Sequence, residues 1–342
     1  MSWEYKANKA FKSDSQRLAF SLRSSIAKRC SHLNAALAYL VSMEKILSDY
    51  YFIKDRYANF GHLLYRVRDV SEQDKYVNKW TRTYTEMIKK GGAEEIYLWD
   101  IRIHKSLKEV FTAVCFYQES LIAKESKSWA SFFFLSYYSL FHSMMSCVVL
   151  LPTESVDNLS KITHTKLIKL FKSQFSDQKP HMIREDIGDV FYMFKYLREY
   201  YSYNMPPNDF LYELERSFQP DLKLPFFIRS CTQLASLHSE IIERCFEKHG
   251  SKSKNFVEAD NIRSWYKLLN CPKQPLTGEY HLDYTDRVKM EEVVASPDPR
   301  SFSILLEHFI DEFRLYEGAE FPRFPDGTEI DPGAFVYRVL QG

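Results

Sequence analysis

Arginine and histidine are the residues of this chain whose types and spacing could act on a phosphate. Arginine stabilises negative charge on phosphate oxygens, and histidine exchanges a proton near neutral pH, so a closely spaced pair could cleave a phosphodiester. Two such pairs occur, Arg56 with His62 and Arg244 with His249. Chance alone accounts for two pairs in a chain with 10 histidines among 342 residues, so neither pair by itself identifies a site.

Two other histidines are candidates for proton transfer or ligand binding. His142 lies in a nearly all-apolar stretch, which favours a buried histidine with satisfied hydrogen bonds over a catalytic one. His164 follows Thr163 at a predicted helix start, which favours a role in capping or packing.

Tyrosines crowd around Arg198, at positions Tyr196, Tyr200, Tyr201 and Tyr203. Helical spacing assigns some of them to a core. Tyrosines beside an arginine at a helix end would equally suit stacking against nucleic-acid bases. Both interpretations stay open.

Several other chemistries are excluded at the level of motifs. The chain has no phosphate-binding glycine loop, no dinucleotide fingerprint, no HExxH and no GxSxG. Its six cysteines form no CxxC pair, as the usual zinc and thioredoxin-like motifs would require. We expect these cysteines to be reduced and inert. We also expect no metal ion and no cofactor. The acidic pairs Glu291-Glu292 and Asp311-Glu312 fit a solvated surface.

Composition predicts a helical, globular protein. The chain has only 10 glycines and is 45% hydrophobic, and 46 basic residues balance 45 acidic ones, which argues against a dedicated DNA-coating protein. Residues 1–90 carry a basic excess and 281–342 an acidic one, so we predict that the acidic region packs on the basic one; two unrelated charged faces are the alternative. The polar opening segment has no signal-peptide pattern, so we expect a cytoplasmic protein.

Apolar periodicity and helix-breaking residues predict the helices. They are a long N-terminal helix after Ser13-Asp14 and helices at about 71–90, 94–123, 126–151, 161–175, 185–201, 225–248, 258–270 and 300–316, with a linker at 250–255.

Residues 129–151 carry no charged side chain and are long enough to span a bilayer. Five serines, two tyrosines and His142 argue against a membrane, because each needs a polar partner in hydrocarbon. We therefore predict the central helix of a bundle, with Phe134, Tyr138 and Phe141 buried.

Three blocks of sequence resemble the HEPN superfamily of small helical bundles: WASFFFLSYYSLFHSMM (129–145), ITHTKLIKLFKSQF (162–175) and FYMFKYLREYYSYN (191–204). The matching residues are Tyr137, Tyr138, Phe141, His142, Thr163, His164, Leu167, Phe171, Phe175, Leu197, Arg198 and Tyr203. The resemblance covers residues 110–250.

This resemblance implies a bundle of four or five helices that usually dimerises. In catalytic members an arginine followed by a histidine after four to six residues cleaves RNA without metal. Here the positions after Arg198 hold Tyr203, Asn204 and Met205, so the motif is degenerate. Arg198 and Asn204 are then the candidate catalytic residues. Tyr200, Tyr203 and His164 are the candidates for substrate binding.

We therefore predict a mostly α protein with a helical region 1–109, a HEPN-like antiparallel bundle at 110–250 and a mixed helical and turn-rich region 251–342. Arg198 is expected in a groove at the rim of the bundle. The expected function is RNA or nucleotide binding, with metal-independent ribonuclease activity in bacterial toxin or antiphage defence. The alternative is a non-catalytic scaffold or partner-binding subunit of a defence or toxin–antitoxin complex, and a third reading is a partner of a nucleotidyltransferase. We expect a homo-oligomer or a protein partner, and no membrane.

Overall fold

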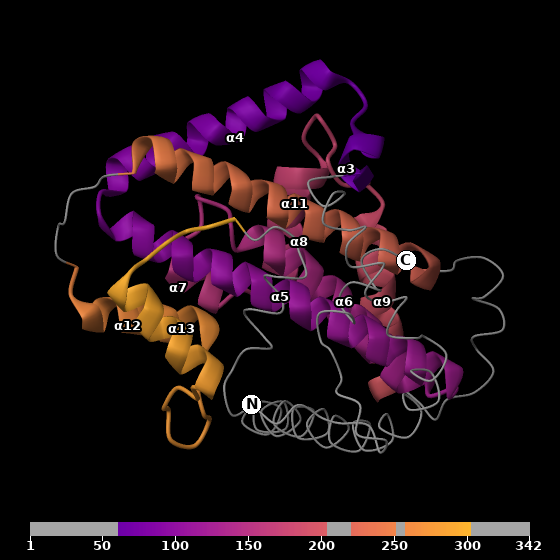
Figure 1. The fold of residues 1–342 in the computed structure, drawn as a ribbon. Helices are drawn as coiled ribbons and strands as arrows, with labels where there is room; N and C mark the ends of the chain where they lie inside the picture. Colours follow the sequence, from indigo (N-terminus) through magenta and orange to yellow (C-terminus); the bar gives the residue numbers. More distant parts are fainter. Residues whose placement is uncertain (1–60, 204–219, 251–256, 302–342) are drawn as a thin grey trace, which may run out of the picture. The chain divides into compact units, whose positions relative to one another are not determined.

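The computed structural model describes residues 61–203, 220–250 and 257–301, and every regular element in these ranges is a helix (Figure 1). The elements are α3 (Gly61–Arg66), α4 (Val70–Gly91), α5 (Glu94–Glu125), α6 (Trp129–Val148), α7 (Val156–Ser160), α8 (His164–Phe171), the π-helical turn η1 (Lys172–Ser176), α9 (Ile187–Tyr203), α11 (Pro220–His249), α12 (Ala259–Asn270) and α13 (Tyr284–Ala295). Within these ranges there is no β-strand, only an isolated bridge between Lys273 and Tyr280. The predicted mostly α class is confirmed.

Some predictions concern residues outside these ranges. They are the helices at the N-terminus and at 300–316, the linker at 250–255, the role of Asn204 and the packing of the acidic C-terminal region on residues 1–90.

Helices α5 and α6 form a hairpin whose two arms run antiparallel. The chain reverses through Lys127, whose φ of 55° is left-handed. The hydroxyl of Ser139 donates to the carbonyl of Ala113 at 2.7 Å, and that of Ser106 donates to the carbonyl of Ser146 at 2.6 Å. As the residue number rises along α6, the partner's number falls along α5, which defines the antiparallel register.

Backbone carbonyls satisfy the hydroxyls of three of the four buried serines of α6, and the buried hydroxyl of Ser136 has no partner among the described residues. Ser139, Ser143 and Ser146 are almost completely buried, and each donates to a backbone carbonyl of α6 or α5. Such back-bonding satisfies a buried hydroxyl, and small side chains let two helices approach closely. Among the described residues, no helix has the length and apolar character needed to cross a membrane.

Helix α6 lies at the centre of the bundle, as predicted. Besides α5, it packs against α8, α9 and α11 (Figure 1). Helix α9 runs antiparallel to it, because Phe133 contacts Tyr201 near the end of α9, whereas Tyr137 contacts Phe191 near its start.

One stripe of α6 is less completely buried than the rest of the helix. Phe134, Tyr138 and Phe141 are half-buried and pack against the core, so they are not the mostly exposed residues that would contradict the prediction. They recur at helical spacing, and their rings pack on one another, with centroids 4.7 Å apart for Phe134 and Tyr138. This stripe meets the start of α8 and side chains of α9, which cover it only in part.

A buried arginine holds the C-terminal end of α6. Arg102 on α5 donates to the carbonyl oxygen of Leu151 at 3.0 Å and also to those of Val149 and Glu154. Burial lowers the pKa of Arg102 to about 10, so it stays charged at neutral pH. A cation at this end opposes the negative pole of the helix and satisfies carbonyls that have no helical partner.

One helix start differs from the sequence prediction by five residues, and two helices were not predicted. Helix α11 begins at Pro220, and Pro225 lies inside it, within the first two turns, where the missing amide disrupts few helical bonds. Helix α7 and helix α13 were not predicted. Helix α13 is held by tertiary contacts, because the buried carboxylate of Asp286 accepts from Lys108 at 2.6 Å and from the Tyr266 hydroxyl at 3.1 Å.

Candidate functional site

The three sequence blocks meet where α6, α8 and α9 come together. We call the following residues the Arg198 cluster: Tyr137, Tyr138, Phe141, His142, His164 and Arg198. His164 contacts the rings of Tyr137, Tyr138 and Phe141, and the guanidinium of Arg198 contacts both tyrosines.

Arg198 does not lie on an open face. Its side chain is 13% exposed, and its guanidinium lies over the ring of Tyr137, 4.5 Å from the centroid. One terminal nitrogen is 3.4 Å from the Tyr138 hydroxyl and the other 3.0 Å from the carboxylate of Glu199. Among the described residues the buried Nε atom has no hydrogen-bond partner. An unpaired donor on a buried cation is costly, and an anion would reach this atom only if the side chain moved. The expectation of a groove here stays a prediction.

His164 is held at the first position of α8. Thr163 caps this helix, its hydroxyl accepting from the amide of Lys166 at 3.2 Å. The imidazole Nδ1 shares a hydrogen bond of 2.6 Å with the Tyr137 hydroxyl. Burial, and then the positive charges of Arg198 and Lys195, lower the pKa of His164 to about 4, so it is neutral at physiological pH. The capping and packing expected of this segment are therefore present.

His142 is paired with a carboxylate that the sequence prediction missed. Its Nδ1 lies 2.5 Å from Oε2 of Glu109 on α5, and the other oxygen of Glu109 accepts from Lys105 at 2.7 Å. Burial raises the pKa of Glu109, but Lys105 and His142 outweigh it and lower the pKa to about 2. Glu109 is therefore ionised. An acid on the buried face of an amphipathic helix, opposite a charge-free helix, was the signal that could have indicated this pair.

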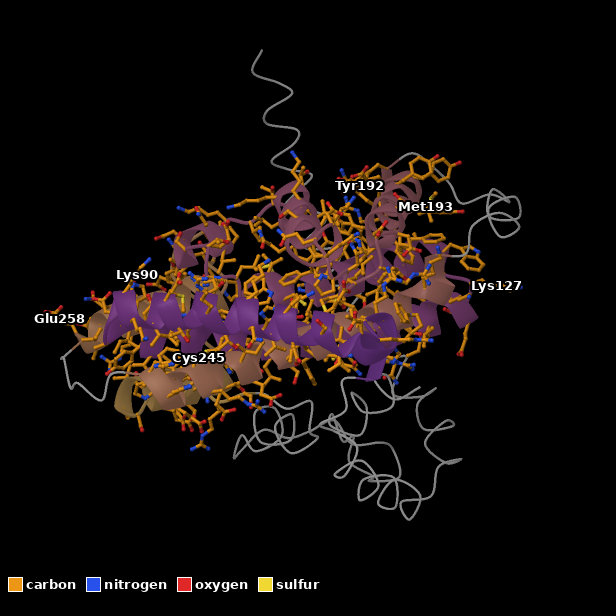
Figure 2. The ribbon with its side chains drawn as sticks, turned by 90° about the horizontal axis from the view of Figure 1, so that it is seen from above. Lys90, Lys127, Tyr192, Met193, Cys245 and Glu258 are labelled. Carbon is orange, nitrogen blue, oxygen red and sulfur yellow. The ribbon has the colours of Figure 1, made fainter. Side chains whose placement is uncertain are left out.

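The tyrosines of α9 divide between its two faces. Tyr201 is buried and stacks on Phe133, whereas Tyr192 and Tyr196 are each 50% exposed and Tyr203 is 59% exposed. Figure 2 shows Tyr192 at the outer side of the bundle. Tyr200 is half-buried beside Tyr196. The core interpretation is confirmed for Tyr201, and the stacking of bases on the exposed tyrosines stays a prediction.

The chance arginine–histidine pairs do not form sites in the described residues. Arg244 is exposed and pairs with Glu240 one turn away, and His249 lies at the exposed end of α11. Arg56 lies outside the described ranges. In the same ranges, no group of three or more histidine, cysteine or acidic side chains is placed to hold a metal ion.

Comparisons of the chain with protein-family models, with curated proteins and with solved structures found no match. The resemblance to the HEPN superfamily therefore depends on the three sequence blocks alone.

Proposed function

We propose that this protein binds RNA, or a ligand carrying a nucleotide, at the Arg198 cluster, and that it cleaves RNA there without a metal ion. The observation that carries the proposal is the guanidinium of Arg198, which is largely buried, stacked on tyrosine and left with an unpartnered Nε. A phosphate oxygen is a strong acceptor for such a donor.

The surroundings of Arg198 suit a nucleotide. Tyr138 and Phe141 present half-buried rings beside it, on which a base could stack. Tyr192 and Tyr196 on α9 are exposed and one helical turn apart, about 6 Å along the axis, which would let two successive bases stack. They lie on the outer face of α9, more than about 100° around the helix from Arg198, so they form a separate surface. The HEPN resemblance suggests a bacterial toxin or antiphage defence setting and a homodimer.

A non-catalytic scaffold is the second candidate. Tyr203 stands where the motif's histidine could, and Glu199 already neutralises part of the charge of Arg198. In this reading the exposed tyrosines of α9 contact a protein partner within a defence or toxin–antitoxin complex.

The test compares wild-type protein with Arg198→Ala and Arg198→Lys. Binding of a labelled single-stranded RNA is measured at two salt concentrations, and cleavage is measured in EDTA. We expect Arg198→Ala to weaken binding about tenfold and to reduce the salt dependence by about one phosphate contact. Arg198→Lys should restore the charge but not the stacked geometry, and recover binding only in part.

Arg184→Ala is the matched control, because Arg184 also pairs with an acidic near neighbour, Asp186, and lies over a ring, that of Phe226. It should bind RNA as the wild type does. If wild-type protein does not bind RNA, or if Arg198→Ala and Arg184→Ala bind equally well, the proposal is wrong. Binding that depends on Arg198 without any cleavage would support RNA binding at the Arg198 cluster and overturn the proposed cleavage.

A further inference from the structure

We infer that His142, oriented by Glu109, accepts the proton of the RNA 2′-hydroxyl and so takes the place of the histidine missing after Arg198. This inference rests on the proposed function. It assigns a catalytic role to His142 and a positioning role to Glu109, neither of which the arginine–histidine spacing indicates.

The hydrogen bond between Glu109 and His142 determines the tautomer of the imidazole. An ionised carboxylate can only accept hydrogen bonds, so the proton in this bond belongs to Nδ1 of His142. In the neutral imidazole the lone pair is then on Nε2. No hydrogen bond to a described residue engages that atom, and the side chain is 21% exposed. His142 is therefore oriented as a base whose accepting atom is not occupied.

Glu109 is itself held rigidly. Its side chain is 7% exposed, and Lys105 on the preceding turn of α5 binds the oxygen that His142 does not use. The two contacts leave Glu109 little freedom to rotate. A carboxylate in this position orients an imidazole and stabilises the imidazolium that forms when the imidazole takes up a proton.

His142 and Arg198 both lie close to the ring of Tyr138. The centroid of Tyr138 lies 6.3 Å from that of His142 and 5.8 Å from the guanidinium carbon of Arg198. A ribose bound over Tyr138 would thus have a base and a cation for its phosphate near the same ring. The ring of Phe116 contacts both Tyr138 and His142.

His164 is less suited to this role. Its Nδ1 is bonded to the Tyr137 hydroxyl and not to a carboxylate. It also lies among positive charges, which make it a weak base, with a pKa lowered to about 4 by burial and then by Arg198 and Lys195. We expect it to contact the ligand by its ring.

The proposed step balances without a co-reactant. Nε2 of His142 takes the proton of the 2′-hydroxyl, and the 2′-oxygen forms a bond to the adjacent phosphorus. The bond from phosphorus to the 5′-oxygen breaks, and that oxygen takes a proton from water. The imidazolium then returns its proton to water. The products are a 2′,3′-cyclic phosphate and a 5′-hydroxyl, and Arg198 stabilises the charge that develops on the phosphoryl oxygens.

The experiment measures RNA binding and RNA cleavage in EDTA for wild type, His142→Gln, His142→Ala and Glu109→Gln. We expect His142→Gln to bind RNA within threefold of wild type and to cleave it at least about a hundredfold more slowly. The half-exposed space left by His142→Ala should let added imidazole restore part of the cleavage. An RNA with 2′-deoxyribose at the cleaved position should bind and remain intact.

Glu109→Gln tests the positioning role through the pH profile. The charged and titratable groups around His142 are Glu109 and Lys105 on α5, His164 on α8 and Arg198 on α9. Glu109→Gln removes the carboxylate that orients the imidazole and stabilises the imidazolium, so the acid limb of the cleavage profile should move to lower pH. A merely structural role would leave that limb in place. Circular dichroism establishes that the variant is folded.

His181→Gln is the matched control, because His181 is also a half-buried histidine near a carboxylate, that of Glu185, with Nδ1 bonded. It should cleave as the wild type does. The inference is wrong if His142→Gln cleaves within threefold of wild type, if the 2′-deoxy RNA is cleaved, or if wild-type protein binds RNA through Arg198 but cleaves none. If wild-type protein binds no RNA, the proposed function fails too, and the binding measurement separates that case from the others.

Discussion

The Arg198 cluster and a second group on α4 and α11 are built from the same residue types but differ in their access to solvent. The second group, which we call the His238 network, consists of Tyr76, Tyr84 and His238. All three side chains are buried, whereas His142 and His164 in the Arg198 cluster are half-buried. The network joins two helices that lie side by side in Figure 1.

Both imidazole nitrogens of His238 are occupied. The Tyr84 hydroxyl donates to the carbonyl of Leu150 at 2.8 Å, so it accepts from Nδ1 of His238, also at 2.8 Å. Nε2 must then accept from the Tyr76 hydroxyl, again at 2.8 Å. Burial, and then the charge of Lys79, lower the pKa of His238 to about 3. A neutral, fully bonded imidazole has no atom left for a ligand.

The comparison shows that two histidines in one bundle differ in how many of their ring nitrogens are hydrogen-bonded to the protein. His238 stabilises the packing of α4 on α11, because both of its nitrogens bind the protein. His142 has one nitrogen bound and the other unoccupied among the described residues, beside an arginine with an unpartnered Nε. The following predictions test this contrast, from the largest expected effect on stability to the smallest.

Truncating His238 should have the largest effect on stability. His238→Ala leaves a cavity and deprives two buried tyrosine hydroxyls of a partner, so we expect a loss of about 4 kcal/mol in the free energy of unfolding. Urea unfolding followed by circular dichroism measures it. RNA affinity per folded molecule should not change, and a parallel loss of affinity would contradict the separation of the two groups.

Acid should destabilise the protein through the same histidine. The folded pKa of about 3 lies below the unfolded value of 6.5, so the unfolded state binds the proton first and stability falls as the pH drops from 6.5 towards 3. The contribution at pH 4 is about 3 kcal/mol. His164, whose pKa is lowered to about 4, adds a further loss over the same pH range, reduced because its imidazole is only half-buried. Glu109, whose pKa is also lowered, adds to this loss only below its usual value of 4.5. Unfolding measured at pH 7 and pH 4 checks the sum, and an NMR titration in which His238 gains its proton near pH 6.5 would contradict it.

Removing one hydroxyl from each group gives a matched pair of variants. Tyr84→Phe leaves the carbonyl of Leu150 and Nδ1 of His238 without their partner inside the core, which should cost about 2 kcal/mol. Tyr137→Phe removes a single bond to His164, whose imidazole is half-buried and can bind water instead, so about 1 kcal/mol is expected. Equal losses in unfolding free energy would mean that the two groups do not differ in access to water.

The exposed tyrosines should matter least for folding. Tyr196→Ala should change the free energy of unfolding by less than about 0.5 kcal/mol, because the side chain is half exposed. If bases stack on it, RNA affinity should fall at least about fivefold, since stacking contributes about 1–3 kcal/mol per base. Leu276→Ala, at a 95% exposed position on a loop, is the control, and equal RNA binding by the two variants would exclude stacking on Tyr196.

The local sequence was sufficient to predict most of the helices and to predict which helix lies at the centre of the bundle. The helices predicted at 71–90 and 258–270 correspond to α4 and α12 almost residue for residue, because capping and apolar spacing act within a turn or two. Helix α13 escaped prediction although Asp283 caps it locally, its carboxylate accepting from the amide of Asp286. Its buried Asp286 also bonds to Lys108 on α5 and to Tyr266 on α12, contacts that the sequence does not show.

The candidate site was predictable only in part. The sequence blocks indicated Arg198 and His164, but Glu109 lies 33 positions before His142, and nothing local links the two. We expected His142 to be a buried histidine with its hydrogen bonds satisfied. Among the described residues, only its Nδ1 atom has such a bond, to Glu109.

The sequence by itself determined that this protein is helical in the ranges described and that its charge-free segment lies inside a bundle, because the period of apolar residues and the cost of exposing them are properties of each segment alone. Only the tertiary structure decided that, within the part of the chain described, both ring nitrogens of His238 are hydrogen-bonded to the protein and that only one nitrogen of His142 is. That choice depends on the rotation and register of α5, α6, α9 and α11 against one another. A shift of one residue along a helix turns a side chain by about 100°, enough to exchange a buried bond for a solvent-facing nitrogen.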